Sequence, residues 1–254
     1  VERTIAEELG KPVGELFSAF DQTPIASASV AQVHRATLPS GEEVAVKVRR
    51  PGLDDLVAFD LSVMRALRDV GVVDQVGVSN YALRRWQRAE VDLGGVVLSN
   101  QVQFNLVHRD PMAEMLPWAA RTRHVVLAYS PLAQGLLSAR YDAEHRPTNR
   151  IRAANAMFLP ENLRAAGPLL SVLRDVAAAH DATPAQIALA WTVHHPHVVA
   201  IPGASSMAQV ESNAAAAEIT LAPDEYGALL AAAEAFTPTT GVSAIPALVR
   251  ARRS

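Results

Sequence analysis

Residues 124–135 have the sequence HVVLAYSPLAQG, in which a short valine-rich run ends at a tyrosine and a serine and then enters a turn. Short apolar runs without polar alternation are typical of strands that are buried on both faces of a sheet. The same order, an apolar run followed directly by polar residues, recurs through the second part of the chain. It predicts strands over residues 75–78, 96–102, 124–128 and 198–201.

Stretches with a helical spacing of apolar residues separate these strands. One begins at Pro184 behind Thr183, a capping residue followed by proline at the first helical position. Strands that alternate with helices indicate a parallel sheet covered by helices. We therefore predict an α/β fold in which four β/α units form half of an eightfold TIM-type barrel. The expected helices are 82–93, 113–120, 167–180, 184–194 and 207–217.

The first part of the chain has a different rhythm. Apolar residues have a helical spacing over 4–19 that is broken by Gly10 and Pro12. Two β-rich runs at 29–38 and 43–49 are joined by the sequence PSGE. A link of this length and composition predicts a β-hairpin. A helix is predicted over 54–70, after a Pro-Gly pair.

Composition limits the function. The net charge of −3 gives no sign of nucleic acid or an anionic membrane as a partner, and no apolar run reaches the about 18 residues that a transmembrane helix needs. The chain has no cysteine, which excludes disulfides, thiolate catalysis and cysteine-bound metals. We therefore expect a cytoplasmic protein that binds neither nucleic acid nor membranes.

Lysine usage restricts the chemistry further. Lys11 and Lys47 are the only lysines, and all the other basic residues among the 23 are arginines. Arginine cannot share a proton with a phenol, because its pKa is too high. A mechanism that needs a Lys–Tyr pair must therefore join the two parts of the chain, because every tyrosine lies in the second part: Tyr81, Tyr129, Tyr141 and Tyr226.

Polar side chains follow the predicted strands at the points where ligands bind in parallel β/α folds. Capping and turn formation explain such residues equally well, and the spacing does not decide between the two alternatives. The residues concerned are Ser79, Asn80, Asn100, Gln101, Tyr129, Ser130 and those at 203–206.

The motifs VGVSNY (76–81), SNQVQF (99–104), AYSPLAQG (128–135) and IPGASS (201–206) resemble the second half of an aldo-keto reductase, over about residues 67–236. The resemblance implies the last four β/α units of that barrel and NADP(H) as the cofactor. Three groups of residues would bind it. Ser79, Asn80, Gln101 and Tyr129 would hold the nicotinamide; Ser130, Leu132, Gln134, Gly135 and Arg140 the phosphates; and Gly203, Ser205, Gln209 and Asn213 the adenosine end.

The same resemblance implies a small carbonyl compound as substrate and a catalytic tetrad of Tyr, Lys, Asp and His. The tetrad belongs to the first four barrel units, and no matching segment occurs in this sequence. Ser212 also departs from the family, because many relatives carry an adenine-binding carboxylate at this position and here Glu211 stands one step earlier.

Residues 1–66 resemble the nucleotide-binding lobe of UbiB-like atypical kinases, through ASVAQVH (28–34) and VKVRRPG (46–52). The resemblance implies a weak nucleotide-binding role for Lys47, whereas a solvent-facing lysine on a hairpin is the plain alternative. The kinase catalytic loop is missing. We therefore divide the chain into a kinase-like helix and β-hairpin module, 1–66, and a reductase-like half-barrel, 67–254.

Two further patterns have structural explanations. The triplet His108-Arg109-Asp110 matches the kinase catalytic triplet but lacks its downstream asparagine, so we assign it no kinase chemistry. The histidines at 194, 195 and 197 have no carboxylate spaced to complete a metal site, and we expect them to form a solvated helix end.

Several functions remain open at this point. NADP(H)-linked carbonyl reduction has as rivals a non-catalytic nucleotide-binding or scaffolding protein and a UbiB-like kinase fragment. An artefactual join of two genes would explain why both active sites lack residues. Because four parallel strands cannot close a barrel, we also expect self-association through the open half-barrel.

Overall fold

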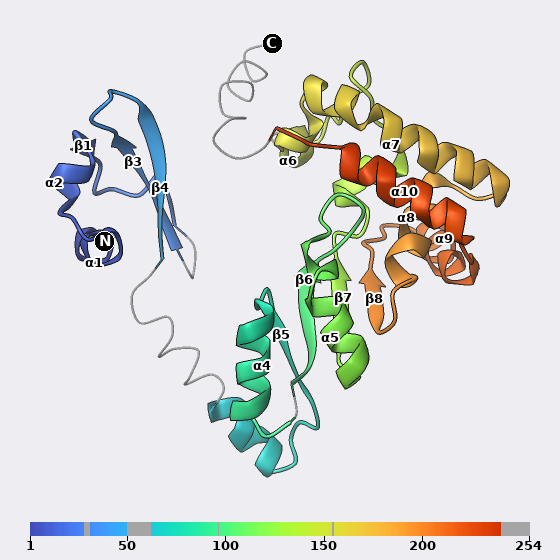
Figure 1. Ribbon diagram of the computed structural model, residues 1–254, viewed down its shortest axis with the longest axis horizontal. Coiled ribbons are helices and arrows are strands. Elements are labelled where there is room, and N and C mark those ends of the chain that lie inside the picture. The colour runs from blue at the N-terminus through green and yellow to red at the C-terminus, as the bar shows by residue number, and fades with distance from the viewer. Residues whose placement is uncertain (28–30, 50–61, 96, 154, 240–254) are drawn as a thin grey trace. The chain divides into compact units, whose positions relative to one another are not determined.

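The structure is a computed structural model that describes residues 1–27, 31–49, 62–95, 97–153 and 155–239. The chain divides into two compact units, Val1–Val70 and Gly71–Ser254, which are described separately below (Figure 1). The domain boundary expected at 66/67 stays a prediction. Among the helices described, none combines the length and the apolar character needed to cross a bilayer.

The first unit is a small antiparallel sheet with two short helices. Strand β3 pairs with β4 along its whole length, with His34 opposite Val46 and Ala36 opposite Val44. The turn closes where the backbone N–H of Leu38 donates to the carbonyl of Glu42 at 2.9 Å. The elements are α1 (Glu2–Leu9), α2 (Val13–Leu16), β1 (Ala19–Phe20), β2 (Ala26–Ser27), β3 (Ala31–Thr37) and β4 (Glu43–Arg49).

The helical segment expected over 4–19 is interrupted where Gly10 and Pro12 predict a break, because α1 ends at Gly10 in the left-handed conformation (φ 69°) and Pro12 precedes a new helix. Ala19 and Phe20 then join the sheet as β1. Of the helix expected over 54–70, residues 62–69 are helical, and its start lies outside the described residues.

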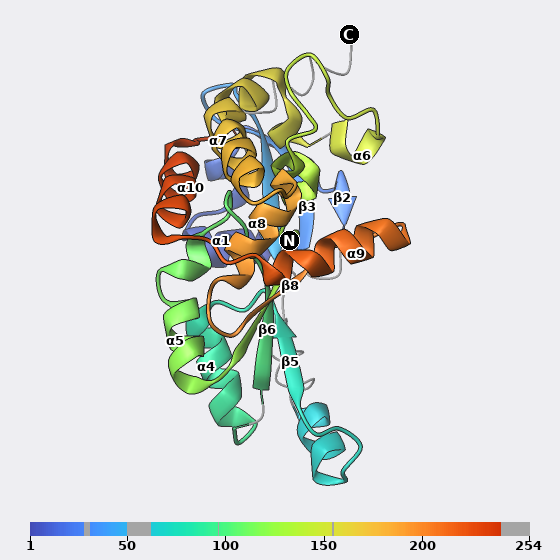
Figure 2. The same cartoon turned by 90° about the vertical axis from the view of Figure 1, so that its right-hand side faces the viewer.

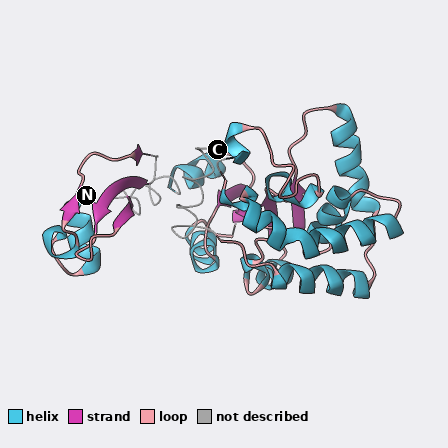
Figure 3. Ribbon diagram, turned by 90° about the horizontal axis from the view of Figure 1, so that it is seen from above, coloured by secondary structure: helices cyan, strands magenta, loops and turns pink. Residues whose placement is uncertain are grey.

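The second unit contains a sheet of parallel strands in the order β5-β6-β7-β8 (Figure 1). Figure 3 shows the strands of this unit in magenta among its cyan helices. These are β5 (Val76–Ser79), β6 (Val97–Gln103), β7 (Val125–Tyr129) and β8 (Val198–Ile201). Each strand lies within a residue or two of its predicted range. This is the predicted partial (β/α)8 barrel.

Helices cover one face of this sheet: α4 packs on β6, α5 on β7 and α8 on β8 (Figure 2). The helices and short 3-10 turns of the unit are α4 (Leu83–Asp92), η1 (Asp110–Met112), α5 (Met115–Thr122), η2 (Ala133–Ser138), α6 (Arg150–Ala153), η3 (Ala156–Phe158), α7 (Pro160–Ala179), α8 (Pro184–Val193), α9 (Met207–Ala215), η4 (Ala216–Glu218) and α10 (Pro223–Ala235).

The covered face forms a large core. Trp86, on α4, is fully buried and packs edge to face against Trp118, with ring centroids 4.8 Å apart. Its indole N–H donates to the carbonyl of Val97 at 3.0 Å. Val126 and Ala128 are fully buried on β7 beneath the helices. Each large side chain buried in this way contributes about 1.5–3 kcal/mol.

The opposite face of the sheet differs from the prediction that both faces are buried. On β8, Val199 is 48% exposed and Ile201 is 40% exposed, and Ser79 at the end of β5 is exposed as well. This face would form the interior of a closed barrel, and four strands enclose no interior.

Helix α7 and the chain after α10 are joined at a buried asparagine. The predicted helix 167–180 starts earlier than expected, at Pro160, and continues through Pro168. Near its start, the amide of Asn162 donates to the carbonyl of Thr239 at 2.9 Å and accepts from the N–H of Thr239 at 2.8 Å. Asn162 is only 2% exposed, so this pair is shielded from water.

Candidate cofactor site

The ends of β5, β6 and β7 bring together polar side chains that are far apart in sequence. The Tyr129 hydroxyl donates to Oδ1 of Asn80 at 3.1 Å, and the Asn80 amide donates to Oγ of Ser79 at 3.1 Å. Ser79 in turn donates to the carbonyl of Gln101 at 3.2 Å. Because parallel strands end at the same edge, this network spans three strands on the open face of the sheet.

The backbone fixes the direction of Asn80. Its φ is 56°, in the left-handed region, where asparagine is tolerated better than most residues. Its N–H donates to the carbonyl of Gln101 at 2.8 Å, which continues the sheet one residue past β5. The side chain of Asn80 is thereby turned over the end of β6 towards Tyr129.

Asn100 behaves differently from its neighbour Gln101. It is fully buried on the helix-covered face, where its amide donates to the carbonyl of Tyr81 at 2.8 Å. Its Oδ1 accepts from the N–H of Tyr81 at 3.3 Å. For Asn100 the structure therefore favours the structural alternative over ligand binding, because alternate residues of a strand face opposite sides.

The loop after β7 is built from unusual backbone conformations. Ser130, Ala133 and Gln134 have φ between 47° and 57°, and Gly135 has φ of 101°, where only glycine is unstrained. Non-glycine residues held in this region cluster at functional sites. The loop carries four residues predicted to contact the cofactor phosphates, of which Gln134 is exposed, with Oε1 3.0 Å from the amide of Asn155.

A buried asparagine that the sequence did not single out holds this loop. Asn105, fully buried, donates from its amide to the carbonyl of Ser130 at 2.9 Å. Its Oδ1 accepts from the N–H groups of Val107 at 2.8 Å and His108 at 2.9 Å. A polar residue just beyond β6 was the only signal in the sequence that could have revealed Asn105.

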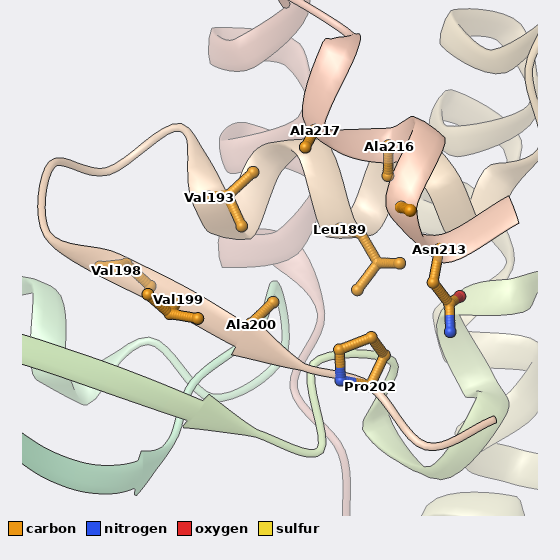
Figure 4. A pocket seen from close by; sticks show the side chains of 10 residues that line it. Leu189, Val193, Val198, Val199, Ala200, Pro202, Asn213, Ala216 and Ala217 are labelled. Atoms are coloured by element: carbon orange, nitrogen blue, oxygen red, sulfur yellow. The ribbon is translucent and has the colours of Figure 1, made fainter. Parts of the chain in front are cut away.

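The residues expected at the adenosine end gather at the start of α9. Oε1 of Gln209 accepts from the N–H of Ser205 at 2.7 Å and from its hydroxyl at 3.1 Å, and Ser206 caps the helix. Asn213 lies one turn further on, where it lines an apolar cavity of about 390 Å³ beside β8 (Figure 4). Arg140 is exposed, and so is Gly203.

Residues 53–234 match the family model of the aldo/keto reductases, which is more than half of the chain. The chain belongs to the aldo/keto reductase family. An uncharacterized oxidoreductase of Mycobacterium tuberculosis is 42% identical over 258 residues, which cover 100% of this chain and 80% of that protein.

Solved structures of this family share the fold. An aldo-keto reductase from Klebsiella pneumoniae in complex with NADPH is 30% identical with a TM-score of 0.52, and the match covers 71% of this chain and 54% of that one. A thermostable aldo-keto reductase in complex with the inhibitor epalrestat is 26% identical with a TM-score of 0.53, covering 68% and 53%. This aldo/keto reductase therefore spans about half the length of the solved structures that it matches.

The beginning of the chain matches a second family. Residues 1–87 match the model of the ABC1 atypical kinase-like domain. A probable protein kinase UbiB of Pseudomonas entomophila is 66% identical over 58 residues, which are 23% of this chain and 11% of that protein. The predicted fusion of a reductase half-barrel with a UbiB-like segment is thus confirmed.

The kinase-like segment places Lys47 on the outside of its sheet. Lys47 lies on β4 opposite Val33 and is exposed, whereas Val48 next to it belongs to the core with Ile5 and Phe17. The first three residues of the ASVAQVH motif, 28–30, lie outside the described residues. The role of Lys47 in nucleotide binding stays a prediction.

Of the three histidines near the end of α8, His194 and His197 are exposed, as expected for a solvated helix end. His195 differs from this expectation: its ring lies 5.2 Å from that of Phe104 and 5.3 Å from that of Trp191, and its Nε2 is 3.3 Å from the Tyr226 hydroxyl. Burial, with a smaller effect of His194, lowers the pKa of His195 to about 4. Within the described ranges, no group of three His, Cys, Asp or Glu residues could hold a metal ion.

Proposed function

We propose that this aldo/keto reductase binds NADP(H) along the carboxyl ends of β5–β8, with carbonyl compounds as its substrate class. The observation that carries the proposal is the hydrogen-bonded series from Tyr129 through Asn80 to Ser79, which presents one aromatic ring and several amide and hydroxyl groups at one edge of the sheet. An NADPH complex of a relative that is 30% identical supports the same cofactor here.

Each part of the proposed site suits a different part of the cofactor. The ring of Tyr129 offers a flat apolar surface for the nicotinamide, and the amides of Asn80 and Gln101 can pair with its carboxamide. The turn at 130–135 has the left-handed backbone conformations of a loop that can approach an anion closely, and Arg140 adds positive charge for the phosphates. Ser205 and Gln209, at the start of α9, stand where a helix favours an anion.

When bound, NADPH supplies a hydride to a carbonyl carbon, and the carbonyl oxygen then needs a proton. The usual donor in this family is a tyrosine tuned by a lysine, but both lysines lie in the first unit and all four tyrosines in the second. An untuned tyrosine, with a pKa of about 10, is a poor acid near neutral pH. This separation favours a second candidate function, cofactor binding without turnover.

Titration calorimetry with NADPH tests the binding proposal. We expect weak binding, with a dissociation constant well above about 1 μM, because an open half-barrel holds its site less rigidly than a closed one. Tyr129→Ala should weaken binding further, Tyr129→Phe less so, and the control Tyr226→Phe not at all. Heat changes indistinguishable from the blank for the unmodified chain would contradict NADP(H) binding.

Turnover separates the two candidate functions. We expect NADPH to be consumed with an aromatic aldehyde no faster than in the buffer alone, since the second unit contains no lysine to tune its tyrosines. Aldehyde-dependent oxidation of NADPH that is lost in Tyr129→Ala would instead establish carbonyl reduction by this chain.

A further inference from the structure

The sheet of the second unit has two open edges that match each other. Neither β5 nor β8 pairs with another strand on its outer side among the residues that the structure describes. Both strands are four residues long and show the same alternation: the first residue is buried, the second and fourth are exposed, and the third is half-buried. Open edges present unpaired N–H and C=O groups, which are a template for another strand.

The uncovered face of the sheet has the composition of a barrel interior. It exposes Val199 and Ile201 of β8 and half-buries Leu127 of β7, next to the polar Ser79 and Gln101. Exposed valine and isoleucine side chains beside an open edge are costly in water, and association removes them from it.

The apolar cavity beside β8 is a groove on the helix-covered side of this strand, and it adds to the apolar surface at this edge of the sheet. Its volume is about 390 Å³, and Asn213 is the single polar residue among those that line it (Figure 4). Leu189 and Val193 come from α8, Val198 from β8, and the opposite wall from the end of α9 and η4. A strand added beside β8 would place its outward side chains at this groove. On β5, Val78 faces outward, because it pairs with the buried Asn100.

We propose that two copies of the chain close one eight-stranded barrel, with β8 of each copy in parallel contact with β5 of the other. Eight strands are the number at which side chains fill a barrel interior, and each copy supplies four that already run parallel. A two-fold axis along the barrel makes both junctions identical, so no edge remains. The first unit offers a different geometry, since its strands form their own antiparallel sheet.

Light scattering of the full chain gives the first measurement. We expect a mass of twice 27.1 kDa. Val199→Lys should yield monomers, because its ammonium group would be enclosed in the barrel without water. The control Val91→Lys, at a residue of α4 that is 75% exposed, should stay dimeric. If Val199→Lys does not fold, as judged by circular dichroism, the milder Ile201→Gln takes its place. A monomeric unmodified chain would overturn the proposal.

Cross-linking identifies the junction. The chain has no cysteine, so Gln75→Cys and Pro196→Cys place exposed thiols just before β5 and β8. In the proposed barrel the thiol at position 75 of one copy lies near the thiol at position 196 of the other copy. Within one chain the two strands are three spacings apart, about 14 Å. A bis-maleimide much shorter than this distance should therefore link chains of the double variant.

The single variants provide the discriminating control. Neither should cross-link by itself, because identical strands stand on opposite sides of a two-fold barrel. Mixing the two single variants should restore the link, which a contact inside one chain cannot do. A dimer in which the double variant stays unlinked, or in which one single variant links to itself, would show a different interface and refute the barrel.

Discussion

The two sheets of this protein satisfy their hydrogen bonds in different ways. In the first unit, β3 lies between β4 and the short strands β1 and β2, and the pairing partners are close in sequence. In the second unit, each of the first three strands is followed by helices before its neighbour appears, and the sheet has two open edges within the part of the chain that the structure describes. The first unit has a small core that is complete locally, and the second has a large core on only one side.

This contrast teaches that core size and completeness are separate properties. Ile5, Phe17, Ala36 and Val48 are the buried residues of the first unit's core, a small set for a stable domain. The second unit buries two tryptophans completely and still exposes valine and isoleucine on its sheet. The second unit should therefore contribute most of the free energy of unfolding. Its exposed apolar sheet face should also be the main cause of self-association.

The largest effect is expected from Trp86→Ala. Removal of a fully buried indole leaves a cavity and costs about 3–5 kcal/mol. Hydrogen exchange should rise throughout β5–β7 and stay unchanged in β3 and β4, since the two units are separate clusters of contacts. Trp86→Phe, which keeps an aromatic ring, should have a smaller effect. Equal loss of protection from exchange in both units would show that the two units do not have independent cores.

The next effect is expected from Asn105→Ala. The substitution leaves the N–H of Val107 without its acceptor, which costs about 1–3 kcal/mol for an unsatisfied group. The carbonyl of Ser130 still accepts from the N–H of Ala133, and the N–H of His108 still donates to the backbone carbonyl of residue 105. Urea unfolding should show the loss, and NADPH binding should weaken with it because the loop at 130–135 is released. Asn105→Asp keeps the acceptor and should be milder. Unchanged stability would show that water replaces the amide.

A pH-dependent effect should follow from His195. Its pKa is lowered to about 4 in the folded chain, so the neutral ring is favoured there. The unfolded chain takes up a proton below pH about 6.5, and stability therefore falls between about 6.5 and 4. The loss of stability should be on the order of 2 kcal/mol, which is less than for a fully buried ring because solvent screens a partly exposed one. The melting temperature of His195→Phe, measured across this pH range, should fall less steeply with decreasing pH than that of the unmodified chain.

The smallest effect is expected from Lys47→Ala. The side chain is exposed on β4, so the free energy of unfolding should change by less than about 0.5 kcal/mol. Val48→Ala, one residue along and 7% exposed, should destabilise the first unit clearly more. Urea titration with both variants would measure the difference. A larger loss at Lys47 would show that its side chain has a structural partner.

The sequence predicted those features that depend on neighbouring residues. Valine-rich runs located all four parallel strands, and the PSGE link located the hairpin, because period and turn chemistry are local. Gly10 and Pro12 likewise located the break between the first two helices, because both residues act on the local backbone. Asn105 and His195 were missed for another reason: their importance comes from Ser130, Phe104 and Tyr226, which only the tertiary structure brings near.

The contact between Asn162 and Thr239 closes a loop across 77 positions of the chain. The rest of α7, together with α8, β8, α9 and α10, lies inside this loop. The contact therefore acts as a non-covalent cross-link around the last β/α units. Bringing the two ends of such a long segment together costs conformational entropy. This cost is a single term for the whole segment, independent of the elements that fold inside it. A chain cut before Thr239 would lose this closure and leave the buried Oδ1 of Asn162 without its donor, although the Asn162 amide would still donate to the carbonyl of Ala156. The tail at 236–239 therefore belongs to the minimal folding unit.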